Sequence, residues 1–253
     1  MFLNHPEALP RQPRATRRRL LASAARGLAA GLLGAVAGLL GAVAGWGGSA
    51  WAGAFDDFFR ALKLDDVDAV RALLRRGFDP NAVDAHGNSA LYLALQYHAL
   101  KVARLLLDQP HLRLDQRNPE GETALMIACL RGDTALAEAM VARGAAVNPP
   151  GRAPAWSALS YAATDGHDDL VKFLLAHGAL VDRPAPNGTT PLMMAAYFGH
   201  TSTVRLLLAA GADPKRRNAM GFTALQLAMR RSHEATAQVL GHALDRARKP
   251  GQW

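Results

Sequence analysis

The feature that most constrains this chain is a motif that returns at a nearly constant interval. Five segments share a leucine that is followed three residues later by an alanine, and these leucines are Leu91, Leu125, Leu159, Leu192 and Leu225. Their spacings are 34, 34, 33 and 33 residues, and one further step back reaches Phe58 and Ala61. A second apolar stripe follows in each unit at i, i+3 and i+4, which predicts a helix. A period of this length predicts stacked helical pairs.

The repeat resembles the ankyrin repeat. The likeness is carried by T-P-L-x-x-A-A over 190–196, by Gly199 and His200, and by V-x-L-L-L-x-x-G-A-D over 204–213. This resemblance implies an all-α solenoid of about six helix-turn-helix units with short β-hairpin-like loops. We expect a repeat domain over 55–245, and then a basic tail over 246–253. The units are expected at about 55–84, 85–118, 119–151, 152–185, 186–218 and 219–245.

Two recurring positions predict how the helices begin and end. A serine or threonine stands where each first helix would start, and its side-chain oxygen can accept backbone N–H bonds; these residues are Ser89, Thr123, Ser157, Thr190 and Thr223. Glycines follow four of the second stripes, where a helix ends in a left-handed residue; they are Gly77, Gly144, Gly178 and Gly211. The histidine that usually follows T-P-L in the family is absent from every unit, so the bonds that it makes are expected to be lost. We take Leu206 as a representative core position.

The sequence contains no recognisable catalytic or metal-binding motif. The single cysteine, Cys129, excludes an intrachain disulfide and a four-thiolate metal site, and we expect it to be a small core residue. We interpret His167 and His200, at the repeat's G-H position, as loop-stabilising residues. Because repeats fill the predicted mature chain, we expect no enzymatic activity, no cofactor and no metal.

The resemblance implies that the chain binds a protein on the concave side of the stack, through hairpin tips and the exposed faces of the first helices. Exposed aromatic and arginine side chains dominate the energetics of such interfaces. The candidate residues are Asn88, Glu122, Trp156, Thr189 and Phe222 at the hairpins, and Tyr97, Arg131, Tyr197, Phe198, Arg230 and Arg231 late in the first helices. Packing on the next hairpin is the alternative role for Trp156 and Phe222. Of Tyr197 and Phe198, we expect one to face outward and the other to be core. We expect a monomer.

The net charge of +8 is concentrated at the two ends of the chain. Residues 1–54 hold six arginines against Glu7 alone, and residues 214–253 hold eight basic against two acidic residues. The C-terminal basic residues form either a solvated cap or a surface for an acidic protein or anionic lipid. We do not expect a nucleic-acid partner for an exported chain.

Residues 1–54 have the order of a secretory signal. Arg17, Arg18 and Arg19 precede an uncharged apolar run over 27–45, and small residues then offer two A-x-A sites over 50–54. We therefore expect cleavage after Ala52 or Ala54 and a periplasmic mature chain. The segment 16–21 resembles a bacterial twin-arginine signal, and the general secretory route is the alternative.

An uncleaved membrane anchor is the competing interpretation of the same segment. The apolar run is 19 residues long, close to the roughly 20 that span a bilayer. Residues 20–45 would then hold the chain at the inner membrane, with the repeats facing the periplasm. Two functions follow: an exported scaffold that binds a protein, or a membrane-anchored inhibitor or immunity-type component that uses the basic C-terminal unit.

Overall fold

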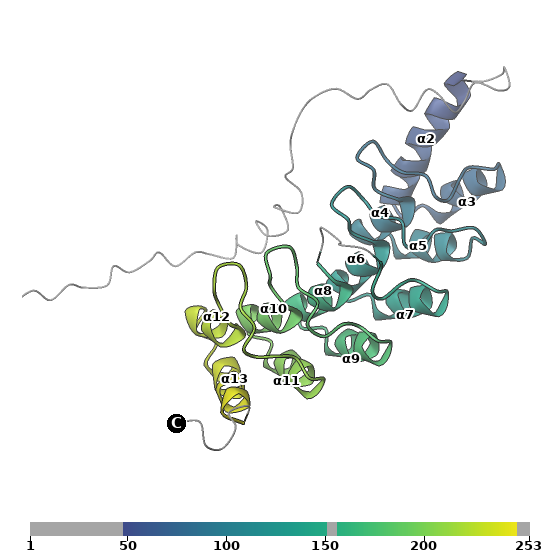
Figure 1. The fold of residues 1–253 in the computed structure, drawn as a ribbon. Coiled ribbons are helices and arrows are strands. Elements are labelled where there is room, and N and C mark those ends of the chain that lie inside the picture. The colour runs from purple at the N-terminus through teal and green to yellow at the C-terminus, as the bar shows by residue number, and fades with distance from the viewer. Residues whose placement is uncertain (1–47, 151–155, 247–253) are drawn as a thin grey trace, which may run out of the picture. The chain divides into compact units, whose positions relative to one another are not determined.

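Twelve helices follow one another in pairs over residues 48–150 and 156–246, the part of the chain that the computed structural model describes (Figure 1). The first helices of the pairs are α2 (Gly48–Lys63), α4 (Ala90–Gln96), α6 (Ala124–Arg131), α8 (Ala158–Asp165), α10 (Pro191–Phe198) and α12 (Ala224–Arg230). The second helices are α3 (Val67–Arg75), α5 (Leu100–Leu107), α7 (Thr134–Ala142), α9 (Asp168–Ala176), α11 (Thr201–Ala209) and α13 (Glu234–Arg246). The predicted all-α class is confirmed for these residues.

The predicted leader lies mostly outside the described residues. Its arginines, its apolar run and the tail over 247–253 are among the residues that the structure leaves out. The predicted cleavage sites at Ala52 and Ala54 fall within α2, which begins at Gly48. Within the described part of the chain, no helix combines the length and the apolar character needed to cross a membrane.

The helix starts are built as the sequence predicts, with an added set of bonds. Ser89, Ser157, Thr190 and Thr223 each accept the amide N–H of the third residue of the helix that follows. The expected loss of bonds at the missing histidine position is not complete. Met193 Sδ and Gln226 Oε1 accept the amide N–H of Thr190 at 3.5 Å and of Thr223 at 3.0 Å, so the helix turn is closed by a different chemistry. Thr123, which opens α6, donates its own amide N–H to Met126 Sδ at 3.4 Å.

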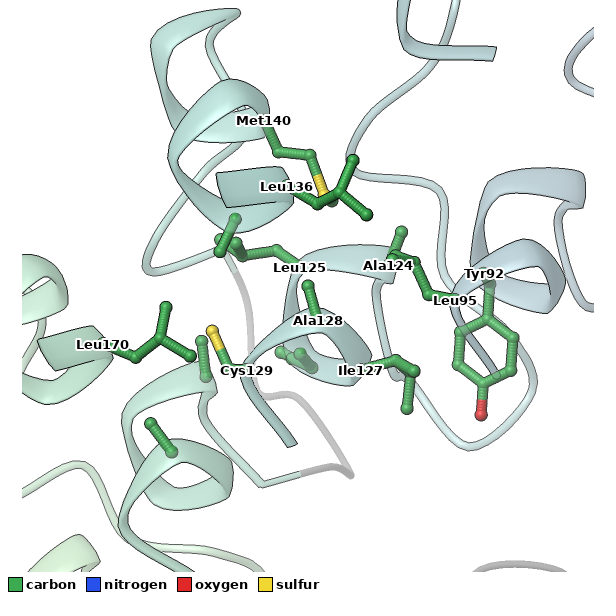
Figure 2. Packing of buried hydrophobic residues seen from close by; sticks show 14 of the residues in the cluster. Tyr92, Leu95, Ala124, Leu125, Ile127, Ala128, Cys129, Leu136, Met140 and Leu170 are labelled. Atoms are coloured by element: carbon green, nitrogen blue, oxygen red, sulfur yellow. The ribbon is translucent and has the colours of Figure 1, made fainter. Parts of the chain in front are cut away.

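The helices form two layers, because first helices contact the first helices of neighbouring units and second helices contact second helices. The recurring leucines are buried between units, from Leu91 to Leu192, whereas Leu225 is only half-buried because no described unit follows it. Figure 2 shows the buried side chains of α6 between those of α4 and those of α7 and α9. Cys129 is fully buried among them, as predicted, and burial raises the pKa of its thiol above the ordinary range.

The predicted core position Leu206 packs against the core but is not fully buried. Leu206 is half-buried, whereas its neighbour Leu207 and the preceding Val204 are completely buried. Residues three apart share one face of a helix, so Val204 and Leu207 point inward together and Leu206 is turned toward the edge of α11. The run of three leucines does not by itself show which one faces the core.

Each described hairpin is closed by the same pair of backbone bonds. In the hairpin over 118–122, the amide of Asn118 donates to the Glu122 carbonyl at 3.0 Å and the amide of Gly121 donates to the Asn118 carbonyl at 2.9 Å. The hairpins over 84–88, 185–189 and 218–222 repeat this pattern. Gly121 has φ +81°, a conformation that glycine adopts without strain. The predicted β-hairpin-like loops are therefore tight turns; the one β-bridge among the described residues joins Val83 and Ser89.

A histidine in each of the last three units reaches back to the unit before it. His167 Nε2 lies 3.3 Å from the Leu130 carbonyl oxygen, and His200 Nε2 lies 3.0 Å from that of Thr164. His233 repeats the contact on Tyr197 at 3.2 Å. Each ring also packs on the left-handed glycine that ends the preceding first helix, so that a Cβ on Gly132 would lie 2.6 Å from His167 Cε1. The predicted loop-stabilising role of His167 and His200 is confirmed.

A second ladder of bonds joins the loops beyond the second helices. Asn81 Oδ1 accepts the amide N–H of Arg113 at 2.7 Å, and Asn148 Oδ1 accepts that of Leu180 at 3.1 Å. Asp115 accepts from Ala146, and Asp182 accepts from Asp213. These side chains recur once in each of the first four units, at 81, 115, 148 and 182. Both ladders satisfy backbone groups of one unit with side chains of its neighbour.

The third unit departs from the histidine contact and carries Asp133 in that place. Its neighbour in the preceding unit is His98, which stands at the position of the left-handed glycine with φ +60°. The shortest distance between them, from His98 Nδ1 to Asp133 Oδ1, is 4.0 Å. The Asp133 side chain is only 10% exposed, and its Oδ2 is buried without a hydrogen-bond partner. Burial raises the pKa of Asp133, while His98, Arg131 and His167 act in the opposite direction.

A buried glutamate ties three units together. Tyr92 of α4 donates its hydroxyl to Glu122 Oε2 at 2.6 Å, and Asn118 Nδ2 donates to the same oxygen at 3.1 Å. Tyr161 of α8 donates its hydroxyl to Glu122 Oε1 from the other side. Burial and the adjacent Glu122 carboxylate raise the pKa of both tyrosines beyond their ordinary range. We call this cluster of four residues the Glu122 strut.

The buried carboxylate of Asp133 predicts a stabilising substitution. Because the folded-state pKa is raised, ionisation of Asp133 costs stability at pH values above that pKa. We expect Asp133→Asn to increase the free energy of unfolding at pH 7.5 by about 1 kcal/mol, and this gain to shrink as the pH falls toward 4. Urea unfolding followed by circular dichroism measures both values. Asp169→Asn, the same change at an exposed carboxylate paired with Lys172, is the control and should not stabilise.

The Glu122 strut predicts a loss of stability that depends on one hydroxyl group. Tyr92→Phe should lower the free energy of unfolding by about 1.5–3 kcal/mol, because it removes a hydrogen bond to a buried carboxylate. Tyr97→Phe, at a half-exposed ring, should change it by less than about 0.5 kcal/mol. Since the tyrosine pKa values are raised by folding, stability should fall as the pH rises above about 10, and less steeply in Tyr92→Phe. Equal effects of the two substitutions at neutral pH would contradict the strut.

Candidate protein-binding surface

The carboxyl ends of the first helices form a row in which side chains contact the neighbouring unit at three junctions. The Lys63 ammonium of α2 lies 5.3 Å from the ring centroid of Tyr97, which follows α4. Arg131 at the end of α6 donates from Nη2 to the Gln96 carbonyl at 2.7 Å, and the Arg231 guanidinium lies 4.8 Å from the Tyr197 ring centroid. We call this arrangement the helix-end row. It brings together the candidates that the sequence placed late in the first helices.

The helix-end row exposes side chains of several kinds. The side chain of Tyr97 is 50% exposed, and Arg131, Arg230 and Arg231 are exposed as well. Tyr197 and Phe198 are both half-buried and meet edge to face with ring centroids 5.0 Å apart. Tyr197 packs against the core, whereas Phe198 does not, so the two differ in the expected sense although neither is fully buried. Both stand in the last turn of α10.

The hairpin candidates differ more in burial than their shared register suggests. Glu122 and Thr189 are buried, and both oxygens of the Glu122 carboxylate already accept hydrogen bonds in the strut. Asn88 is half-buried, and its Nδ2 lies 3.3 Å from Asp84 Oδ1. Trp156 and Phe222 are half-buried, so each retains surface that a partner can contact. Binding by any of these residues stays a prediction.

Sequence reasoning missed three exposed residues on this side of the molecule. Lys63 belongs to the row because its ammonium contacts the Tyr97 ring. It occupies the position of Tyr97 one repeat earlier, so extending the repeat register by one unit would have identified it. Met220 and Met229 are 69% and 62% exposed at the last hairpin and on α12. Met229 stands in the last described unit, where no neighbour covers a position that is buried in the other units. Met220 stands at a hairpin position where His86, Glu120 and Asn187 are exposed too, so its signal is an apolar residue at an exposed position.

The described residues offer no constellation for catalysis or metal binding. No group of three or more histidine, cysteine, aspartate or glutamate side chains in the described ranges is placed to hold a metal ion. An open depression between α3 and α5 is lined by charged residues, but Asp66 there caps α3 and Asp65 accepts the amide N–H of Val102 at 2.9 Å. Its lining comes from α3, α5 and the residues that flank them.

Comparison with known proteins places the whole repeat region in one group. The family described as ankyrin repeats (3 copies) matches residues 110–185 and 159–248, and that described as ankyrin repeats (many copies) matches residues 58–107. The mouse B-cell lymphoma 3 protein homolog is 32% identical over 131 residues, which cover 51% of this chain and 29% of that protein. The chicken nuclear factor NF-kappa-B p105 subunit is 34% identical over 138 residues, covering 53% and 14%. The chain thus spans less than a third of the length of these relatives.

Solved structures agree with this assignment over a larger share of the chain. An ankyrin repeat domain from Acinetobacter baumannii matches 74% of this chain and 96% of its own, with 26% identity and a TM-score of 0.63. A second ankyrin-repeat protein matches 73% and 96%, with 25% identity and a TM-score of 0.63. Together with the stacked helix pairs, the capped hairpins and the matched residues, these likenesses show that the chain belongs to the ankyrin-repeat family.

Proposed function

We propose that this chain is an exported scaffold that binds a protein partner through the helix-end row and the adjoining hairpins. Ankyrin repeats generally mediate protein–protein interaction, and they typically do so without catalysis. The observation that carries the proposal is the presence on this row of exposed arginines beside the exposed Tyr97 and the half-buried Tyr197 and Phe198, at positions where the units differ from one another. Such side chains supply most of the energy of protein interfaces.

Recurring structural residues and variable exposed residues occupy different positions of the repeat, and this separation supports the same proposal. The residues that hold the stack together, such as His167, Asn148 and Ser157, recur from unit to unit and are engaged in bonds. Tyr97, Arg131 and Phe198 share one position of the repeat but have different chemistry. Variation at a repeated, accessible position is what recognition of a particular partner requires, because a solenoid presents its surface as a row of separate side chains.

Export is proposed from the sequence of the first 54 residues. The aromatic side chains of the first unit are compatible with cleavage at either predicted site. Phe55 lies 4.8 Å from Phe59 between ring centroids, and Phe58 stacks on Phe78 at 4.3 Å. A chain that starts at Gly53 or Phe55 keeps all four rings. The mature protein would then act in the periplasm.

The alternative function is a membrane-anchored inhibitor or immunity-type component. It is favoured by the excess of basic residues near the C-terminus, seven against three acidic residues over 186–246. In that case residues 20–45 remain attached, and the basic end of the stack lies near anionic headgroups.

The binding proposal predicts that partner capture depends on two hairpin aromatics. We expect the mature domain to retain one or more proteins from periplasmic extract, and the double variant Trp156→Ala/Phe222→Ala to lose them. Affinity capture with mass spectrometry provides the measurement. Leu180→Ala removes a comparable exposed apolar side chain, 55% exposed, in the connection after α9, and should leave capture unchanged. Equal capture by all three proteins would move the binding site away from these hairpins.

The export proposal predicts the mass of the mature protein. Expression of the full chain in a bacterium should yield a periplasmic product that starts at Gly53 or Phe55, measured by intact mass after fractionation. Replacing Arg17, Arg18 and Arg19 with lysine keeps the charge, and retention of that variant in the cytoplasm would identify the twin-arginine route. An uncleaved product in the membrane fraction would favour the anchored alternative. An uncleaved product in the cytoplasm would overturn both.

A further inference from the structure

The geometry points to an acidic peptide segment as the ligand of the last unit. The surface consists of Arg217, Phe222, Met229, Arg230 and Arg231 and is called the terminal arginine face. This inference rests on the proposed protein-binding function and deepens it, because it names the chemistry of the partner and the end of the stack where it binds.

Contacts hold the arginines of this face in place without neutralising them. The Arg230 guanidinium carbon lies 4.7 Å from the ring centroid of Phe222, and that of Arg231 lies 4.8 Å from the ring centroid of Tyr197. Arg217 Nη1 donates to the Gly221 carbonyl at 2.7 Å. A guanidinium that packs against an aromatic ring has less conformational freedom in the unbound protein, but its N–H groups can still donate to a carboxylate. Binding therefore costs less side-chain entropy than it would with a freely moving arginine.

The same arginines lack an acidic counterpart. Arg60, Arg71 and Arg216 form ion pairs with Asp57, Asp68 and Asp182 elsewhere in the stack. Within the described residues, no such pair involves Arg217, Arg230 or Arg231. Their exposed positive charge is therefore available to carboxylates from another molecule.

An apolar side chain adjoins Arg230 on α12. Gln226, Met229 and Arg230 stand at i, i+3 and i+4 and share one face of α12. In the earlier units the position of Met229 holds Leu95, Cys129, Ala163 and Ala196, all completely buried under the next unit. Met229 is 62% exposed because no described unit covers it, and Met220 adds a second exposed thioether on the hairpin. Flexible methionine side chains adapt to an apolar ligand group.

The combination specifies one class of occupant. Three unpaired arginines favour a segment with several carboxylates, and the two methionines favour aliphatic side chains between them. A nucleic acid would require a continuous basic track, but the helix-end row changes sign, carrying Arg131 on α6 and Asp165 on α8. The terminal arginine face is short and mixed, which suits a peptide of about ten residues.

The test uses the mature repeat domain and a fluorescein-labelled peptide made of four Glu-Glu-Leu repeats. Fluorescence anisotropy at low ionic strength should show saturable binding that weakens as salt is added. Arg230→Gln/Arg231→Gln should weaken binding at least tenfold. The matched control, Arg75→Gln/Arg76→Gln, removes an exposed arginine pair from the end of α3, and it should bind as tightly as the unchanged domain. Met229→Ser should weaken binding of this peptide several-fold but not that of a Glu-Glu-Gly peptide.

Several outcomes would overturn the inference. Equal weakening by the two arginine pairs would show attraction to net charge alone, and absence of binding would remove the site. Tighter arginine-dependent binding of a 20-nucleotide single strand, or of phosphatidylglycerol vesicles, would assign the face to nucleic acid or lipid instead. The peptide assay needs no natural partner, so its failure leaves the capture experiment on Trp156 and Phe222 as a separate test of the proposed function. Thermal unfolding midpoints of all variants establish that each is folded.

Discussion

The fold depends on contact between successive units, because no helix pair in this chain can bury its own apolar face. The leucines of the first helices are covered only when the next pair is in place, which is why Leu192 is fully buried and Leu225 is not. The polar ladders follow the same logic. His200 reaches a carbonyl at the end of α8, and Asn148 binds the backbone beyond α9, so each unit completes its neighbour's hydrogen bonds. Stability is therefore a property of interfaces more than of units.

Most of this architecture could be predicted from the sequence because it is periodic. The leucine register, the caps at Ser89 and Thr190 and the left-handed glycines all recur, and a recurring residue reports a backbone requirement that every unit shares. Residues that occur once were harder to interpret. Glu122 shares its register with Phe222, and the sequence therefore placed both at a binding surface. Only the positions of Tyr92 and Tyr161, 30 and 39 residues away, show that its carboxylate is enclosed.

For a related reason, the sequence predicted which parts of each unit form the candidate surface, but not how deeply each side chain there is buried. A repeat register locates the hairpins and helix ends but does not set the direction of side chains within one turn. Tyr197 and Phe198 are adjacent at the end of α10 and both are half-buried, but only Tyr197 packs against the core. The exposure of Met229 could not be predicted from one unit alone, because it results from the place of this residue in the last described helix pair.

The strength of the shared framework explains how the chain tolerates local departures from it. Between the second and third units, His98 and Asp133 replace a glycine and a histidine, and the bond that three other units make in this place is missing. The same interface keeps the buried leucines Leu91 and Leu125 and the hydrogen bond that the Ala146 amide donates to Asp115, so the stack continues without that bond. A framework with many small, repeated bonds can lose one of them without losing the fold. That redundancy leaves the helix-end row free to differ between units, and at its C-terminal end Arg230 and Arg231 lie against aromatic rings without an acidic partner among the described residues.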